Sequence, residues 1–222
     1  MAQAVLTSLG CWAQLEAHYQ ESRYDGGSDE SSVRLVGNRK GRFIFTAPHA
    51  VNHIRESKVK YAERGTGGLA ELLASLSDNL ALTVDGPLDY DPNWDQSPDI
   101  PFKRSLLTLL TDRKTVIDLH GMKDDYGVDV CIGLGRAPNG FGNAVAESLE
   151  LAFSRVGFKV NLDWPFDGRR IGTVTDFVQT KGFSACQVEI AARLRYPNIS
   201  HQESNLLLES FVSAVRRAQE CF

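Results

Sequence analysis

The sequence contains no long apolar run and no concentration of basic residues. A helix that crosses a bilayer needs about 20 consecutive, mainly apolar residues, and no segment approaches that length. The first residues also lack the basic and apolar blocks of a secretory signal. The 24 lysines and arginines are outnumbered by 28 aspartates and glutamates, giving a net charge of −4, and no basic run could track phosphates. We therefore expect a soluble, cytoplasmic protein that binds neither a membrane nor nucleic acid.

Cysteine is scarce as well, with four widely spaced residues and no CxxC pair. This spacing excludes a disulfide-rich scaffold. Cys131 and Cys186 lie in strand-like runs, so we expect small, buried side chains with reduced thiols. The chain also lacks a GxSxG elbow and a phosphate-binding P-loop, and Gly133 and Gly135 do not complete a dinucleotide fingerprint.

Strand-like and helical patterns alternate along the 222 residues, of which 42% are hydrophobic. Several strand patterns are apolar throughout, which favours a mainly parallel sheet covered by helices on both faces. We therefore predict a single α/β domain over residues 1–222. The expected strands are 33–36, 42–47, 80–84, 115–119, 129–134, 158–162 and 186–190, and the expected helices are 4–15, 66–77, 144–156 and 202–218.

Three connecting segments have compositions that suggest their structure. Residues 25–32 are polar and predict a surface loop. Residues 37–41 begin and end with glycine, and they predict a hairpin connection between the first two strands. Residues 85–101 include four prolines and predict an active-site or surface loop rather than a domain boundary.

Side chains that can bind metal or transfer protons accompany three predicted strands. His49 follows one strand, His120 ends another, and Glu189 lies within a third. Because sites in open α/β sheets gather at the carboxyl ends of the strands, we expect these residues to converge. Glu63 follows His49 by 14 residues, which is far enough for the chain to turn back and bring a carboxylate to the same place.

Two imidazoles and one carboxylate form a ligand set of catalytic zinc, which keeps a fourth position open. His49, His120 and Glu63 supply that set, and Glu189 is then the candidate base that removes a proton from water. Asp118 shares a strand face with His120 and is expected to orient its imidazole.

Each residue also has a structural explanation. Either histidine alone could be a surface or core residue, and Glu63 could stabilise a helix N-terminus. Glu189 in an apolar strand needs a partner if it is buried, and Arg193 or Arg195 could supply a salt bridge. The joint pattern is more specific than any one of its parts.

Short motifs between about residues 43 and 195 form a wider pattern. They are Ala47-Pro-His49, Glu63 with Gly65-Thr66, Ile117-Asp-Leu-His120, and the segments 129–133, 161–168, 187–190 and 193–194. In order and character these motifs resemble the N-formylglutamate amidohydrolase family, which is similar to zinc carboxypeptidases and poly-gamma-glutamate hydrolases. The resemblance implies a three-layer α/β/α sandwich with a mainly parallel, mixed sheet. It also implies one zinc ion held by His49, Glu63 and His120, with Glu189 as the catalytic carboxylate.

The family resemblance further implies hydrolysis of the amide bond of an N-acyl amino acid, such as an N-formyl one, or of a small acidic peptide-like substrate. A substrate carboxylate requires an arginine fork, because guanidinium forms two parallel hydrogen bonds with it. Arg169, Arg170 and Arg193 are the candidates. The alternative function is that of a non-catalytic protein that retains the pocket to bind a small ligand or a metal.

Two departures from the family pattern leave alternatives open. Family members often carry Asp at the position of Glu63, and an Asn-Arg pair after the late glutamate, where this chain has Ala191 and Ala192. His53 and Glu56 have the HxxE spacing that resembles the first zinc motif of carboxypeptidases, so they are a rival ligand pair. If His53 is not a ligand, we expect it to face the substrate or to stabilise an oxyanion.

Overall fold

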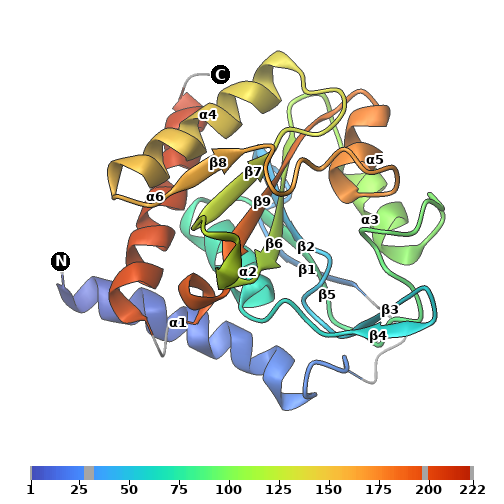
Figure 1. Cartoon of the computed structure of the whole chain (residues 1–222), viewed down its shortest axis with the longest axis horizontal. Coiled ribbons are helices and arrows are strands. Elements are labelled where there is room, and N and C mark those ends of the chain that lie inside the picture. The colour runs from blue at the N-terminus through green and yellow to red at the C-terminus, as the bar shows by residue number, and fades with distance from the viewer. Residues whose placement is uncertain (1, 28–32, 197–199, 221–222) are drawn as a thin grey trace.

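A seven-stranded mixed sheet forms the centre of the molecule, as seen in the computed structural model (Figure 1), which describes residues 2–27, 33–196 and 200–220. Parallel pairs join β2 to β5 and β6, β6 to β9, and β7 to β8, whereas β1–β5 and β7–β9 are antiparallel. The mainly parallel, mixed sheet is therefore confirmed. Across the sheet the strands are β1 (Val33–Gly37), β5 (Leu80–Val84), β2 (Phe43–Ala47), β6 (Thr115–Met122), β9 (Ser184–Ala191), β7 (Val130–Gly133) and β8 (Val160–Leu162).

Helices cover both faces of this sheet and complete a three-layer α/β/α sandwich (Figure 1). On one face, α2 (Thr66–Leu76) and α4 (Gly140–Arg155) pack against the strands, and α1 (Ala2–Glu21) and α6 (His201–Glu220) pack against these two helices. The other face packs against α3 (Pro101–Leu109) and α5 (Val174–Thr180). The short helices η1 (Asp124–Tyr126) and η2 (Ala192–Arg195) follow β6 and β9.

The burial of the strands explains their order in the sheet. Every residue of β2 is buried, as a strand with neighbours on both sides and helices on both faces requires, whereas β1 is half-buried to exposed and lies at the edge. The prediction that residues 37–41 form a hairpin connection between these two strands is wrong, because β5 lies between them. An apolar strand gains most from the sheet interior, where both of its faces leave water.

The remaining predicted strands and helices are present, with ends that differ by up to six residues, the largest difference being at the end of α1. Cys131 and Cys186 are buried in β7 and β9, as expected. The structure adds α3, α5 and a small hairpin of β3 (His53–Arg55) and β4 (Lys58–Lys60). Residues 28–32 of the predicted polar loop lie outside the described residues. Within the described part of the chain, no helix combines the length and apolar character that a membrane span requires.

Candidate metal centre

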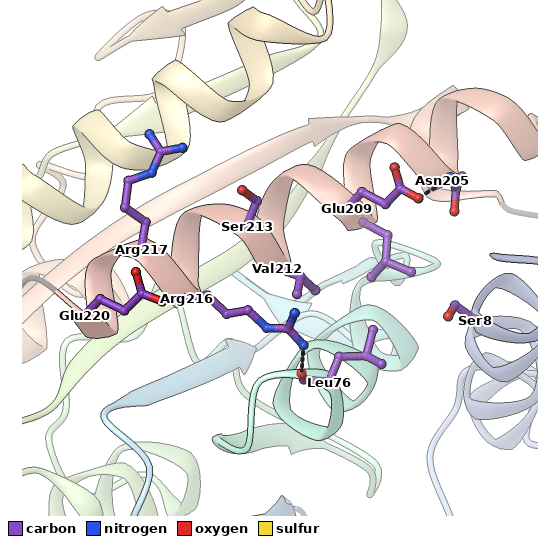
Figure 2. A pocket seen from close by; sticks show the side chains of 10 residues that line it. Ser8, Leu76, Asn205, Glu209, Val212, Ser213, Arg216, Arg217 and Glu220 are labelled. Carbon is purple, nitrogen blue, oxygen red and sulfur yellow. Dashed lines mark hydrogen bonds between the residues drawn. The ribbon is translucent and has the colours of Figure 1, made fainter. Parts of the chain in front are cut away.

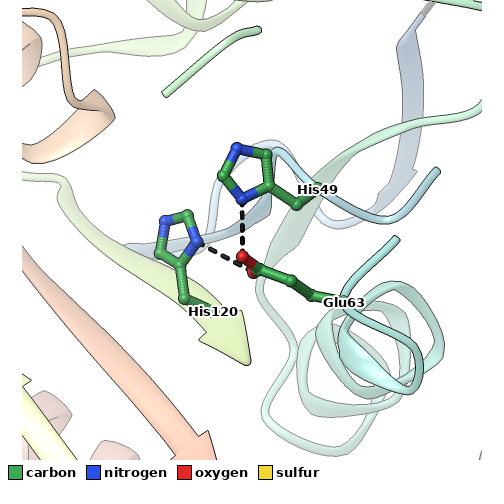
Figure 3. A group of neighbouring side chains, drawn as sticks. All are labelled: His49, Glu63 and His120. Atoms are coloured by element: carbon green, nitrogen blue, oxygen red, sulfur yellow. Dashed lines mark hydrogen bonds and ion pairs between the residues drawn. The ribbon is translucent and has the colours of Figure 1, made fainter. Parts of the chain in front are cut away.

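Two histidines and a glutamate meet at the carboxyl ends of the central strands (Figure 3). His49 Nδ1 lies 2.8 Å from Glu63 Oε1, and His120 Nδ1 lies 3.0 Å from Glu63 Oε2. One potential ligand atom from each residue lies within 4.8 Å of the others. His49 stands on the turn after β2, His120 in β6 and Glu63 in the loop before α2, so the predicted convergence is present.

Backbone hydrogen bonds bring the Glu63 loop back to the sheet. The Glu63 N–H donates to the His49 carbonyl at 2.9 Å, and the Gly121 N–H donates to Glu63 Oε2 at 2.9 Å. Gly65 follows with a φ of 89°, a conformation that favours glycine, and α2 begins at Thr66. The loop is thus held to the ends of both β2 and β6, and this fixes the position of the Glu63 carboxylate relative to the two histidines.

Each imidazole has a second carboxylate on its far side. His49 Nε2 donates to Asp91 Oδ1 at 2.8 Å, and His120 Nε2 donates to Asp118 Oδ2 at 2.9 Å. Metal-binding histidines usually make such a bond, because it fixes the ring and increases its basicity. The contact between Asp118 and the His120 imidazole that the expected orienting role requires is therefore present. Two oriented imidazole nitrogens and a carboxylate oxygen that face one another fit the requirements of a catalytic zinc ion.

Asp91, which belongs to the proline-rich segment 85–101, was not predicted from the sequence. It is fully buried and also accepts a hydrogen bond from Arg55 Nε. His53 Nε2 lies 3.3 Å from Asp91 Oδ2, the oxygen that Arg55 also contacts, and the His53 ring stacks on His49 with 4.3 Å between ring centroids. His49, His53 and Asp91 thus form a second potential ligand group, but the guanidinium already supplies the positive charge beside this carboxylate. The only sequence signal for Asp91 was its position in an expected active-site loop.

The cluster of opposite charges shifts the pKa values of its members. Burial alone would lower the pKa of His49, but the charges and hydrogen bonds of Glu63 and Asp91 raise it to about 9. Burial would raise the pKa of Glu63, but the two imidazoles hold it well below its usual range. Negative oxygen atoms therefore surround the ring nitrogens, an arrangement in which a divalent cation can replace protons.

Glu189 lies beside this cluster on the neighbouring strand, where it pairs in register with His120 of β6. Burial is the main cause that raises the pKa of its carboxyl to about 7, with His120 opposing the shift and Glu63 adding to it. Its closest hydrogen-bond donor among the described residues is the amide of Gln187, at 3.5 Å. A carboxyl with a pKa near neutral pH can both accept and release a proton.

The cluster opens into a cavity of about 540 Å³. Arg170 lies over one face of the Trp94 ring, with its Cζ 3.2 Å from the ring centroid, and the Cζ of Arg55 lies 4.6 Å from the same centroid. These cations and Lys123 offset the acidic residues of the site. The cavity is lined by His49, Arg55, Glu63, Asn93, Trp94, His120, Gly121, Met122, Lys123, Tyr126, Pro165, Phe166, Asp167, Gly168, Arg170, Thr173, Gln187 and Glu189.

Among the expected substrate contacts, only Arg170 lines this cavity. Arg169 is exposed and forms an ion pair with Asp163, while Arg193 forms an ion pair with Asp129. His53 is buried behind His49.

The members of the rival ligand pair lie in different places, because His53 stacks on His49 whereas Glu56 lies away from the cluster. Glu56 is an exposed residue of the turn between β3 and β4. It belongs to neither of the two potential ligand groups, which are formed by described residues.

A larger hollow, of about 630 Å³, lies between α1, α2 and α6 (Figure 2). Arg216 donates to the Leu76 carbonyl across it at 3.2 Å. The described residues that line it include no histidine or cysteine and are Ser8, Leu76, Asn205, Leu208, Glu209, Val212, Ser213, Arg216, Arg217 and Glu220. None of these residues belongs to a potential metal-ligand group, whereas His49, Glu63 and His120 line the cavity at the strand ends.

No family model matches the sequence, and no curated protein is significantly similar to it. Solved structures do share the fold. Gene product Atu2144 from Agrobacterium tumefaciens has a TM-score of 0.61 at 14% identity, covering 86% of this chain and 96% of that one. The N-formylglutamate amidohydrolase from Ralstonia eutropha JMP134 gives 0.55 at 13% identity, with 86% and 100% covered. A bacteriophage poly-gamma-glutamate hydrolase gives 0.52 at 14% identity, with 87% and 91% covered. The fold implied by the sequence motifs is therefore confirmed.

Proposed function

We propose that this chain is a zinc-dependent hydrolase that cleaves the amide bond of a small substrate. The main support is the position of a buried glutamate, Glu189, beside two histidines and a glutamate that face one another. His49, Glu63 and His120 would hold one zinc ion. When bound, zinc polarises a carbonyl oxygen and lowers the pKa of water to about 7.

Glu189 acts as the general base in this scheme. Its carboxylate removes a proton from water as the oxygen attacks the amide carbon, and it then gives this proton to the leaving nitrogen. The pKa of about 7 suits both steps, because the group must be ionised for the first and protonated for the second. Asp91 and Asp118 hold the two imidazoles in place throughout.

The substrate is a small amide that bears a carboxylate, such as an N-formyl or another N-acyl amino acid. Arg170 is the side chain proposed to bind the carboxylate, because it lines the cavity and is stacked on Trp94. Its Nη1 donates to the Trp94 and Ile171 carbonyls, so the edge formed by Nε and Nη2 is the one proposed to meet the carboxylate. The names of two solved structures with this fold, an N-formylglutamate amidohydrolase and a poly-gamma-glutamate hydrolase, agree with an acidic amide.

Metal content and turnover of three proteins test this function. The wild type should bind one zinc ion per chain and hydrolyse N-formylglutamate or N-acetylglutamate, whereas a His49→Ala/His120→Ala variant should lose both properties. Glu189→Gln should retain zinc but lose turnover by about 10²- to 10⁴-fold, the usual contribution of a general base.

Three outcomes would contradict parts of the scheme. Full turnover by Glu189→Gln would remove this residue from its role. A wild type without zinc would refute the metal site. Wild-type protein that binds zinc and N-acyl amino acids across a broad panel without turnover would instead be a binding protein.

A further inference from the structure

Arg195 is a buried residue at the end of η2 whose guanidinium contacts three separate parts of the backbone. Nη1 donates to the Arg64 carbonyl, Nε to the Ile190 carbonyl at 3.1 Å, and Nη2 to the Met122 carbonyl at 3.5 Å. The salt bridge with Glu189 considered from the sequence is thus replaced by bonds to backbone carbonyls. A single rigid group therefore joins three chain segments that are far apart in sequence.

Each of these carbonyls adjoins a residue of the proposed active site. Arg64 directly follows Glu63, Ile190 directly follows Glu189, and Met122 comes two residues after His120. A shift of any one segment would stretch a bond to the same guanidinium. The planar fork has five N–H donors with fixed directions, so it sets the relative positions of all three segments.

Two glycines leave room for Arg195. A Cβ on Gly121 would lie 2.4 Å from the Arg195 Cζ, which is closer than atoms can approach. A Cβ on Gly65 would lie 2.3 Å from the Arg195 carbonyl oxygen. Both glycines adjoin the site, one directly after His120 and the other two residues after Glu63, so the local sequence is adapted to a tightly packed arginine.

We propose that Arg195 is a positioning residue that holds Glu63, His120 and Glu189 in the geometry needed for metal binding and proton transfer. This role presupposes the zinc site described under Proposed function, and it goes beyond it by assigning the alignment of the site to one residue outside the cavity lining. Arg195 is not among the described residues that line the cavity, and its guanidinium donates to backbone carbonyls, so it acts through the backbone.

Arg195→Lys tests this role because it keeps the positive charge but removes the planar fork. A lysine ammonium cannot reach all three carbonyls from one point, so the ligand segments lose their common anchor. We expect a folded protein whose zinc affinity, measured by competition with a chelating dye, is about 10- to 100-fold weaker, the range seen when supporting groups of metal ligands are removed. In the zinc-saturated protein, kcat should fall while KM changes little, because Arg170 is untouched.

Arg34→Lys is the matched control. Arg34 of the edge strand β1 also makes a partly buried guanidinium interaction, with its Nε 2.9 Å from Glu71 Oε1, and neither residue lines the cavity. Its substitution should lower the melting temperature and leave the zinc affinity within twofold of wild type. Wild-type zinc affinity in folded Arg195→Lys would overturn the proposed role of Arg195.

If Arg195→Lys does not fold, Gly121→Ala provides the same test by pushing the guanidinium aside instead of removing it. Weaker zinc binding and lower kcat in that variant support the role, whereas unchanged zinc affinity refutes it. A wild type that fails to bind zinc would refute the proposed function itself. Normal zinc binding by the wild type and by both variants would refute only the role of Arg195.

Discussion

Two hollows formed by the described residues differ in their lining, and the larger of the two has fewer groups that can bind metal or transfer protons. The groove between α1, α2 and α6 measures about 630 Å³ and is lined by helix side chains such as Leu208 and Val212 with charged residues around them. The cavity at the strand ends measures about 540 Å³ but contains His49, Glu63, His120 and Glu189. Volume therefore does not identify a site here. Buried ionisable groups do, because an unpaired one would cost several kcal/mol and each must be compensated by specific neighbours.

The same comparison separates two ways in which a fold makes a concave surface. The groove lies between the helices α1, α2 and α6 and is lined by their side chains. The cavity is built from loops that follow several strands, and the side chains of those loops are fixed by hydrogen bonds such as those of Asp91 and Asp118. Only the second arrangement fixes directions as well as positions, which is what metal binding and proton transfer need.

The largest effect is expected for Asp91→Asn, which alters a residue behind the cavity at the strand ends. The change removes a buried charge that pairs with Arg55 and bonds His49, and loss of one partner from such a pair costs about 3–5 kcal/mol. Zinc affinity should also fall about 10- to 100-fold, because the His49 ring loses its carboxylate. Thermal unfolding without metal and a zinc titration measure the two effects.

Asp85→Asn is the control for Asp91→Asn. Asp85 also pairs with a histidine, His18, but both side chains are partly exposed, at 26% and 42%. Such a pair contributes about 0–1 kcal/mol, and we expect no change in zinc binding. If the two variants were equally stable and bound zinc equally well, the buried carboxylate behind the cavity would have no special role.

A smaller effect, of about tenfold per pH unit, is expected in the pH profile of kcat/KM. A general base works only when ionised, and the pKa of Glu189 is raised to about 7, mainly by burial. Zinc bound beside this carboxylate adds a positive charge that lowers its pKa, so activity of the zinc-loaded enzyme should rise with pH and level off below 7. Rates measured between pH 5 and 9 at constant ionic strength define this limb.

Asp167→Asn provides the comparison for this pH effect. Asp167 lines the same cavity but is only half-buried, and its substitution should leave the acidic limb in place. The residual activity of Glu189→Gln should lack the limb. An unchanged limb in Glu189→Gln would assign the titration to another group.

The predictable part of the site follows from sheet geometry. His49, His120 and Glu189 each accompany an apolar strand, and the carboxyl ends of parallel strands lie at one edge, so their convergence could be expected from sequence alone. Glu63 could be placed near them because the connecting segment was long enough to return. Position along a strand is encoded locally by the pattern of apolar residues.

The unpredicted part depends on contacts that have no local pattern. Asp91 lies in a proline-rich segment without periodicity, and it meets His49 across 42 residues of chain. From the sequence, Arg195 could be predicted only as a salt-bridge partner for a nearby carboxylate. Hydrogen bonds to backbone carbonyls cannot be predicted from residue types, because every residue has a carbonyl. The predicted hairpin between β1 and β2 was wrong for the same reason. A local turn pattern cannot show that a later strand, β5, lies between them in the sheet.

One missed element did carry a recognisable signal. Helix α3 begins at Pro101, and proline suits the first turn of a helix because its missing N–H is not needed there. Phe102, Leu106 and Leu109 then recur at helical spacing and are all buried.

Helix α5 is shorter, at seven residues, and its start is marked by the Thr173 hydroxyl, which accepts from the Asp176 N–H at 3.1 Å. Such a short helix is stabilised mainly by packing, which the sequence does not display.

The smallest effect is expected for Ser213→Tyr, which places a large side chain in the groove of α6. Ser213 is exposed, and substitutions of exposed residues away from special features usually change stability by no more than about 0.5 kcal/mol. Zinc affinity and kcat/KM should both stay within twofold of wild type, because no residue of the groove lines the cavity. A tenfold loss of kcat/KM at unchanged stability would show that the larger hollow takes part in the reaction. Both hollows would then contribute to activity, and the contrast between a reactive cavity and an inert groove would be wrong.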